Sequence, residues 1–471
     1  MQYFAPGRGL RQDGERREAM TKQQDLTQGT IWRGLLGFFF PILLGAFFQQ
    51  LYNAVDTIVV GNFVGKQALA AVGGSAAQMV SLLVGFFMGL SNGGTVVLAH
   101  AFGARDADAM RRSLHTALAF ALAGGVVLTA VGLALSKPTL RWMRTPEDTM
   151  TYSLQYLRII FGGSLASMVY NMGSGLLRAL GDSRRPVLYL AVCCVTNIIL
   201  DLFFVLVLHL EVVGVAVATV MSQVLSAVLI VRALYRLGPD CCLRLRDMRI
   251  DRPQLRRILA IGLPSAVQAS TYSISNLLIQ IPVNALGTDT VAAWTATSKV
   301  DSIYWMVMNA FGMTVLTFVS QNYGAGNMQR TRRGVRTCLL GGLGVGLVIS
   351  WSLFFFGSYV LRLFTRDAEV VRIGVVMIRV LTPLYVSYVF IELFSNTLRG
   401  FGDSFRPTMI VILGVCVLRI LWVFLAVPLR PSVEMICVSY PLSWVVTGIS
   451  LTIYYLHRGR KRAADALGQE I

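Results

Sequence analysis

Charged residues are scarce in this chain of 471 residues. Only 14% of the residues are charged and 55% are hydrophobic, whereas about 25% of an average soluble domain is charged. A water-soluble protein of this length would need a polar surface, and too few charged residues are present to form one. The composition therefore excludes an ordinary soluble domain and indicates a membrane protein.

Spacings typical of metal sites and disulfide frameworks are also missing. The seven cysteines show no CxxC pair and no regular spacing, which argues against both zinc and disulfide scaffolds. The four histidines, His100, His115, His209 and His457, are scattered along the chain. We therefore expect no cofactor, no metal cluster and no enzyme that depends on one.

No nucleotide-binding motif is present. The segment GNFVGKQ at 61–67 is one residue shorter than a phosphate-binding loop and ends in Gln instead of Ser or Thr. The sequence thus argues against ATP-driven pumping by this chain. An ion gradient is the remaining common source of energy for transport.

A net charge of +18 would suggest nucleic-acid binding in a soluble protein. Here, however, the basic residues cluster in short gaps between long apolar runs, as they do beside a membrane. We expect the lipid bilayer as a partner and no nucleic acid.

A helix needs about 20 apolar residues to cross the hydrocarbon layer. Twelve such runs occur, at 34–61, 68–101, 115–136, 155–180, 186–209, 213–236, 256–286, 290–322, 334–364, 370–398, 407–428 and 434–457.

The orientation follows from the Lys and Arg residues on alternate sides of these runs. One side carries 30 of them and the other carries seven. The positive-inside rule then places both termini in the cytoplasm and the chain in the cell membrane. The first 30 residues lack the apolar core of a signal peptide, and Met20 could itself begin the protein.

An internal repeat divides the chain. Residues 177–186 (LRALGDSRRP) and 398–407 (LRGFGDSFRP) share seven of ten positions at an offset of 221. Six runs lie in each copy, so the two copies have the same orientation in the membrane, as in transporters built from parallel repeats. We predict an all-α polytopic protein with two pseudo-symmetric six-helix bundles. Its segments are an N-terminal tail (1–30), an N-lobe (31–236), a basic loop (237–255), a C-lobe (256–457) and a C-terminal tail (458–471).

The N-lobe contains acidic residues inside its apolar runs. Asp56 lies in the first run, and Asn197 and Asp201 lie four residues apart on one face of the fifth. Thr219 adds a hydroxyl in the sixth run. Charges within the membrane are costly and usually functional, so these four residues are the candidate cation-coupling site. A proton and sodium both fit such a site, and a purely structural role, in which each Asp satisfies a neighbouring polar group, remains the alternative.

The C-lobe lacks this acidic set. At the same offset Asn197 becomes Leu418 and Asp201 becomes Trp422, while the C-lobe runs carry Glu392 and Arg419 instead. Structural pairing and contact with substrate are both open for the C-lobe polar residues. The candidates for lining a substrate cavity are Gln268, Tyr272, Asn276, Gln280, Lys299 and Asp301.

Two further features concern helix geometry. Pro41, 15 residues before Asp56, removes a backbone hydrogen bond and favours a kink, so it is a candidate hinge coupled to the carboxylate, with a static kink as the alternative. Asp182 and Asp403, in the two GDS turns, are expected to cap the helices that follow or to favour their N-terminal ends by charge.

The chain resembles the multidrug and toxic compound extrusion (MATE) family from about residue 30 to 457. The similarity rests on LYNAVD in the first run, ALAAVG at 68–73, the paired FGA and QNYGA ends, NIILD in the fifth run and both GDS turns.

This resemblance implies twelve helices in two lobes and export of cationic or amphiphilic compounds by antiport with H⁺ or Na⁺. In prokaryotic relatives the N-lobe cation site would fall on Asp56, Asn197, Asp201 and Thr219. We expect a small-molecule substrate, alternating access and function as a monomer. A lipid-linked flippase of the same superfamily, a simple channel and an intramembrane enzyme are the competing interpretations.

Overall fold

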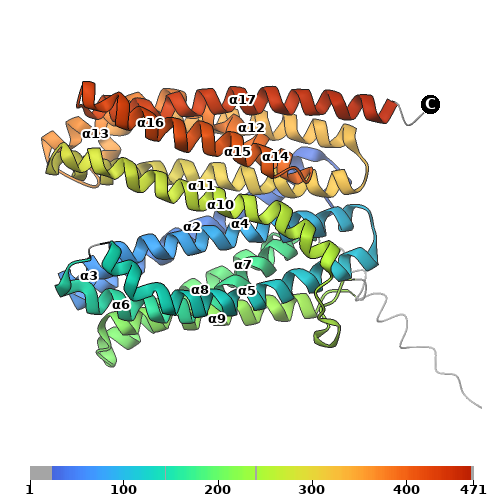
Figure 1. Ribbon diagram of the computed structural model, residues 1–471, viewed down its shortest axis with the longest axis horizontal. Coiled ribbons are helices and arrows are strands. Elements are labelled where there is room, and N and C mark those ends of the chain that lie inside the picture. Colours follow the sequence, from blue (N-terminus) through green and yellow to red (C-terminus); the bar gives the residue numbers. More distant parts are fainter. Residues whose placement is uncertain (1–23, 144, 239–240, 468–471) are drawn as a thin grey trace, which may run out of the picture. The chain divides into compact units, whose positions relative to one another are not determined.

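The computed structural model describes residues 24–143, 145–238 and 241–467, without the side chains of residues 66, 69, 70, 75, 148, 245 and 459–467. Most of the predicted N-terminal tail and the end of the C-terminal tail therefore lie outside the described residues. Within them the chain is helical and contains no strand (Figure 1). An all-helical chain satisfies its backbone hydrogen bonds internally, as crossing a membrane requires.

The helices of the first half follow one another with short connections. They are α2 (Ile31–Val59), α3 (Lys66–Gly73), α4 (Ser75–Gly103), α5 (Ala107–Trp142), α6 (Glu147–Gly162), α7 (Ser164–Ala179), α8 (Arg184–Leu202) and α9 (Glu211–Tyr235). Two π-helical segments extend α2 and α8, η1 (Val60–Val64) and η2 (Phe203–Val207).

The second half repeats this pattern. Its helices are α10 (Arg252–Ala285), α11 (Thr288–Gly324), α12 (Met328–Leu361), α13 (Ala368–Leu381), α14 (Tyr385–Gly400), α15 (Phe405–Val411), α16 (Leu418–Leu425) and α17 (Val433–Leu467). A π-helical segment, η5 (Ile412–Val417), joins α15 to α16. Short 3₁₀ turns occur at η3 (Leu245–Asp247), η4 (Thr382–Leu384) and η6 (Val427–Leu429).

Ten of the helical stretches within the described residues are long and apolar enough to cross a membrane. Two of the twelve predicted runs are not among them, for different reasons. The run 155–180 is divided into α6 and α7, which meet at Gly162 and Gly163, and each part is shorter than a full span. The run 256–286 corresponds to α10, whose length suffices but whose polar residues lower its mean hydropathy.

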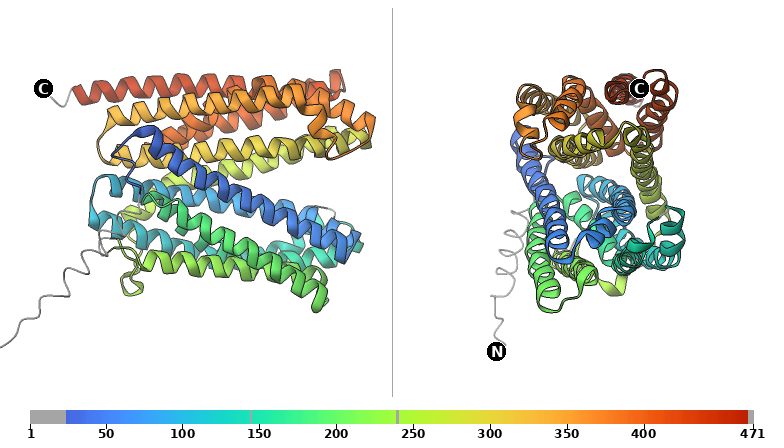
Figure 2. Two further views of the ribbon diagram at one scale, coloured as in Figure 1. Left: turned by 180° about the vertical axis from the view of Figure 1, so that it is seen from behind. Right: turned by 90° about the vertical axis from the view of Figure 1, so that its left-hand side faces the viewer.

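The chain forms two compact units. The first contains residues up to Leu259 together with Ser320–Asn327, the end of α11. Within it α2 packs on α8, α8 on α9, and α7 on α4, α5 and α9. The end-on view in Figure 2 shows these helices, coloured blue to green, as a bundle. The packing places the C-terminal end of α2, through η1, beside η2 and α9, where the candidate acidic residues lie.

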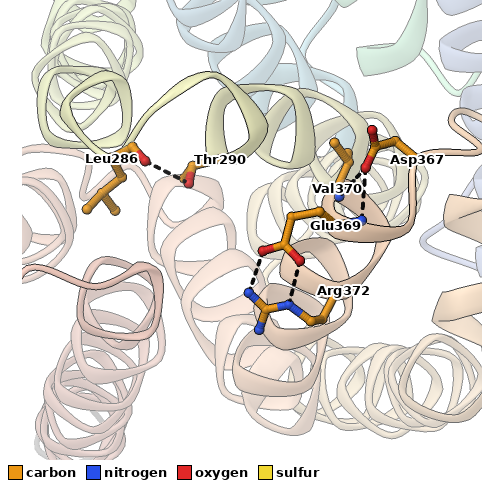
Figure 3. A network of polar contacts seen from close by, with 6 residues as sticks. All are labelled: Leu286, Thr290, Asp367, Glu369, Val370 and Arg372. Atoms are coloured by element: carbon orange, nitrogen blue, oxygen red, sulfur yellow. Dashed lines mark hydrogen bonds and ion pairs between the residues drawn. The ribbon is translucent and has the colours of Figure 1, made fainter.

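The second unit contains Ala260–Val319 and Met328–Ile471. In it α14 packs on α12 and α17, and α13 packs on α12 and α17. Asp367 caps α13 by accepting hydrogen bonds from the backbone N–H groups of Glu369 and Val370 (Figure 3). Glu369 also forms an exposed ion pair with Arg372, which adds little to stability. These contacts fix the beginning of the helix that continues into α14.

The two GDS turns share one backbone feature. Gly181 and Gly402 both have φ of +85°, a left-handed conformation that glycine adopts without strain and that commonly ends a helix. Asp182 then accepts hydrogen bonds from the backbone N–H groups of Arg184 and Arg185, as predicted for a cap. The Asp403 carboxylate accepts a hydrogen bond from the Tyr454 hydroxyl at 2.6 Å, and it directly precedes the N-cap of α15, where a negative charge is favourable.

Candidate functional site

Asp56 and Asp201 lie close to π-helical backbone in the first unit. Asp56 is four residues before η1 and Asp201 is two residues before η2. The π geometry is shown by backbone bonds from Gly65 N–H to the Val60 carbonyl and from Leu208 N–H to the Phe203 carbonyl. Such wide turns are rare and occur often at functional sites.

The four candidate coupling residues come together and are buried. Asp56 is 7% exposed, Thr219 4%, and Asn197 and Asp201 are fully buried. The Thr219 hydroxyl donates to Oδ2 of Asp56 over 3.5 Å. Asp201 and Asn197 are close enough to act electrostatically on the Asp56 carboxyl group, without a hydrogen bond to it. Three helices, α2, α8 and α9, thus contribute to one cluster of oxygen-bearing groups.

Several polar atoms in this cluster have no hydrogen-bond partner among the described residues. They are Oδ1 of Asp56, both carboxylate oxygens of Asp201 and both amide atoms of Asn197. Burying a charged or polar group without a partner is costly, so the arrangement favours binding of a cation or proton. The groups that could bind an ion are carboxylate, amide and hydroxyl oxygens, which suit a proton or a hard cation such as Na⁺.

Transition-metal chemistry finds no support in the described residues. No group of three or more His, Cys, Asp or Glu side chains there is arranged to hold a metal ion.

The cluster also includes two tyrosines that sequence reasoning missed. Tyr52 is 8% exposed and lies one helical turn before Asp56 on α2, so the four-residue spacing could have indicated it. Tyr156 is 7% exposed and comes from α6, packed on α9. No local pattern points to Tyr156, because only the tertiary packing brings α6 to this place.

The remaining polar residues of α9 have other partners. Ser222 donates to the Ala218 carbonyl on its own helix, and Gln223 accepts a hydrogen bond from Ser167 of α7. Ser222 is therefore engaged within α9, and Gln223 joins α9 to α7.

Pro41 lies inside α2, as expected for a candidate hinge. It is partly buried and removes one backbone donor from the helix that carries Asp56.

The substrate-cavity candidates of the second unit are placed differently from one another. Gln268 is buried and accepts a hydrogen bond of 2.6 Å from Nη2 of Arg399. Tyr272 is half-buried and Asn276 is exposed, both on α10. Gln280 donates to Asn284 one turn further along the same helix. These four side chains lie at successive turns of α10 and have different partners, and a shared cavity lining stays a prediction.

Lys299 and Asp301 on α11 differ in their exposure and in their contacts. Lys299 is exposed and forms no ion pair with any described residue. The Asp301 carboxylate accepts a hydrogen bond from the Tyr385 hydroxyl. Tyr304 in turn donates to the Tyr385 backbone carbonyl over 2.6 Å and its ring stacks on that of Tyr385. Asp301 is therefore part of an aromatic cluster, and Lys299 is not.

Glu392 belongs to a connected polar network on α14. Asn396 donates to its Oε1 over 2.8 Å, and Tyr388 donates to its Oε2 over 3.3 Å. Arg399 continues the network to Asn396 and to Gln268 of α10. A glycine of α11, Gly312, makes room for it. A Cβ there would overlap Glu392 and lie 2.6 Å from Nδ2 of Asn396.

Arg419 is the buried cation of α16. It is 4% exposed, and its guanidinium carbon lies 3.9 Å from the ring centroid of Tyr440. Its Nη2 donates to the Ser443 hydroxyl over 3.3 Å, while Nε has no partner. No carboxylate of the described residues lies within ion-pair distance of it.

Tyr440 connects Arg419 to a group of aromatic rings. Its ring centroid lies 6.0 Å from that of Trp294 and 5.9 Å from that of Trp444. Trp444, which is fully buried, lies 5.8 Å from Trp305. The second unit thus combines a buried guanidinium with large aromatic surfaces, a combination that favours planar or charged organic groups.

Comparison with known proteins decides the family. The family model described as MatE matches the chain twice, over residues 41–203 and 264–425, which together make up more than half of it. The chain belongs to the MATE family of transporters. This MATE protein is accordingly a multi-pass membrane transporter of small molecules that needs no cofactor, and not an enzyme.

Relatives of this MATE protein span nearly its whole length. The probable multidrug resistance protein YoeA of Bacillus subtilis (strain 168) is 27% identical over 455 residues, covering 95% of this chain and 98% of its own. A protein named as a FAD transporter, from Shewanella oneidensis, is 25% identical over 453 residues, covering 93% of this chain and 96% of its own.

Solved structures show the same fold. A multidrug resistance MATE transporter in an outward-facing conformation aligns with a TM-score of 0.86 at 24% identity, covering 93% of this chain and 98% of its own. A transporter of the same superfamily from Pyrococcus furiosus Vc1 aligns with a TM-score of 0.87 at 23% identity and the same coverage. The predicted fold class, twelve helices in two lobes, is thereby confirmed.

Proposed function

We propose that this protein exports small organic, cationic or amphiphilic compounds by antiport with H⁺ or Na⁺. It acts as a monomer in the cell membrane, by alternating access of its N-lobe and C-lobe, with both termini in the cytoplasm. The observation that carries this proposal is the buried pair of carboxylates, Asp56 and Asp201, from two helices of one lobe.

The physical argument concerns the cost of charge inside the membrane. A carboxylate at the centre of a spanning helix costs roughly 2.5–3.5 kcal/mol on insertion scales, and two that face each other repel. Binding one H⁺ or Na⁺ relieves both costs. A site that is stable only when loaded, and that opens to alternate sides, can couple the entry of an ion to the exit of a substrate.

The substrate class is supported by two observations. YoeA is named as a probable multidrug resistance protein and the Shewanella relative as a FAD transporter, so we infer an organic substrate with extended rings. The partly buried rings of Trp294, Trp305 and Tyr440 offer the apolar, planar surface that such rings bind.

Uptake of a fluorescent organic cation into inverted membrane vesicles tests the proposal. An imposed pH gradient and an imposed Na⁺ gradient are applied separately, so the coupling ion is identified by the gradient that drives uptake. We expect one of them to accelerate uptake. Uptake of the same rate without any gradient would contradict antiport, and uptake driven only by ATP would contradict secondary transport.

Pro41 is proposed as a hinge through which loading of Asp56 changes the bend of α2. The change Pro41→Ala restores the missing backbone donor, so it should straighten the helix and weaken the dependence of uptake on the gradient. The measurement is the ratio of uptake rates with and without the gradient, compared between the variant and wild type. An unchanged ratio would mean that Pro41 produces only a static kink.

A further inference from the structure

A basic cavity lies between the beginning of α8 and the end of α9, away from the buried carboxylates. Its volume is about 340 Å³. The two helices pack on each other, so the cavity is part of a single unit. It is lined by Arg185 and Tyr189 of α8 and by Leu229, Arg232, Ala233 and Arg236 of α9.

The cavity has an excess of positive charge. Arg185 is paired with Asp182 at 3.1 Å. Arg232 and Arg236, one turn apart on the same face of α9, form no ion pair with any described residue. Guanidinium groups bind phosphate oxygens through paired, charge-assisted hydrogen bonds, and the Tyr189 hydroxyl adds a further polar group. The lining therefore favours a phosphate.

The position of the cavity along the helices points to the membrane surface. The α8 span begins at Arg184 and the α9 span ends at Tyr235, so the three arginines lie within about one turn of the span ends. By the distribution of Lys and Arg, this end faces the cytoplasm. Basic pockets between spanning helices at this level bind lipid headgroups.

Below the arginines the same two helices present apolar side chains. Leu188, Val192 and Val195 of α8 are 61%, 41% and 57% exposed. Val224 and Val228 of α9 are 46% and 57% exposed. Acyl chains would cover this surface, whereas a free phosphate or a soluble nucleotide would leave it bare. The headgroup site and the apolar surface are continuous on the same pair of helices.

We propose that this cavity binds the phosphate of an anionic phospholipid from the cytoplasmic leaflet, with the acyl chains lying along α8 and α9. The guanidinium groups of Arg232 and Arg236 hold the phosphate, Arg185 and Tyr189 complete the headgroup site, and Leu229 and Ala233 form its apolar wall. The proposal does not depend on the coupling ion or on the exported substrate.

Lipid titration of the purified full-length protein in detergent tests this site. Dioleoylphosphatidylglycerol is added, and binding is followed by native mass spectrometry and by the rise in thermal unfolding temperature. Near a membrane surface each arginine is worth about 1 kcal/mol towards an anionic lipid. The double variant R232Q/R236Q should therefore bind phosphatidylglycerol roughly 25-fold more weakly.

A matched control separates a specific site from general surface charge. R333Q/R336Q removes two exposed arginines from the first turns of α12, also on the predicted cytoplasmic side, and should leave the affinity unchanged. An equal loss in both double variants would overturn the site. Dioleoylphosphatidylcholine, which has the same chains without net charge, should bind equally weakly to wild type and to R232Q/R236Q.

Two further arms identify the ligand and guard against misfolding. Inorganic phosphate in large excess should not displace phosphatidylglycerol. If it does, the site binds a free anion and the lipid assignment is wrong. R232K/R236K keeps the charge but loses the paired hydrogen bonds, so it should fall between wild type and R232Q/R236Q. A lysine variant as weak as the glutamine variant, with an unchanged unfolding temperature without lipid, would contradict an electrostatic headgroup site.

Discussion

Equivalent helices of the two repeats carry opposite buried charges. In the first half α8 holds Asn197 and Asp201, both fully buried. At the same repeat positions the second half has Leu418 and Trp422, and the charged residue that α16 buries is Arg419. The two halves share a fold, but the polar chemistry inside them has diverged.

In both halves a π-helical segment lies next to the buried charged residue, and the two segments are not at equivalent positions of the repeat. In the first half η2 begins two residues after Asp201, and in the second η5 ends two residues before Arg419. Residues 412–417 of η5 correspond to 191–196, which are ordinary α-helix in α8. The widened turn therefore accompanies the buried charge in each half, although it falls at different repeat positions.

The polar atoms also differ in how fully they are satisfied. Both carboxylate oxygens of Asp201 lack a partner among the described residues. Glu392, in the second unit, is held by Asn396 and Tyr388. A carboxylate without partners can exchange a cation, whereas one held in a network is better suited to a fixed role. We interpret the first half as the exchanging half and the second as the static one.

The sharpest contrast between the halves is expected from their carboxylates. Asp56→Asn and Asp201→Asn should each lower gradient-driven uptake about 100-fold, the upper range of coupling energies, because a neutral amide no longer exchanges a cation. Glu392→Gln should leave the gradient dependence intact. Initial uptake rates in vesicles of each variant measure this.

Asp108→Asn provides the matched control, because Asp108 is an exposed acidic residue in the first turn of α5 and its loss should not change the rate. If Glu392→Gln abolished the gradient dependence as fully as Asp201→Asn does, both halves would exchange cations and the contrast would be broken.

Gly312→Ala tests whether the network around Glu392 is rigid. The added methyl group would overlap the Glu392 side chain, so we expect the protein to lose about 2 kcal/mol of stability through overpacking. The unfolding temperature in detergent is the measurement. Gly344→Ala, on α12 with no atom near its Cβ, should be neutral or slightly stabilising. Equal unfolding temperatures would show that Glu392 moves aside freely.

Arg419→Met asks whether the buried guanidinium contributes to folding. It has no carboxylate partner among the described residues, and replacing such a charge with an apolar side chain is often neutral or stabilising. We expect stability to change by less than about 1 kcal/mol or to rise. Thermal unfolding next to wild type decides this. A large loss of stability would give Arg419 a structural role in its half, comparable to that of the Glu392 network.

Among the changes that affect uptake, Thr219→Val should have the smallest effect. It removes one hydroxyl donor to Asp56, a bond of 3.5 Å, and keeps the shape of the side chain. The loss is about 1 kcal/mol, equivalent to an approximately fivefold change in the ion concentration that gives half-maximal uptake. Thr271→Val, at a half-buried threonine of α10 bonded to its own helix, is the control. An effect of equal size in both would remove Thr219 from the site.

The candidate coupling site could be located from the sequence because its signal is local. Acidic residues in apolar runs stand out, and a four-residue spacing places Asn197 and Asp201 on one helix face. Tyr156 could not be found in this way, since it lies on α6 and the acidic residues of the site lie on α2 and α8. The division of the run 155–180 was also missed, because two adjacent glycines do not by themselves end a helix.

Among the polar residues of the C-lobe, the partner of Gln268 could not be predicted from the sequence either, because it lies on another helix. Gln268, Tyr272, Asn276 and Gln280 are predicted to line one cavity, and the structure adds that Gln268 bonds to Arg399 and Gln280 to Asn284. Helical spacing gives the face of a residue but not what packs against that face. Arg399 comes from α14, more than 100 residues away in sequence, so no periodicity could have paired it with Gln268.

The membrane class, the repeat and the candidate acidic residues can be read from the sequence, because hydropathy, self-similarity and the cost of burying charge are properties of single segments. Which polar groups have partners follows from the packing of the helices. Oxygens of Asp56 and Asp201 have no partner among the described residues. Glu392 accepts hydrogen bonds from Tyr388 and Asn396 of its own helix. Arg399 links this network to Gln268 of α10, a contact that only the packing of α14 on α10 brings about.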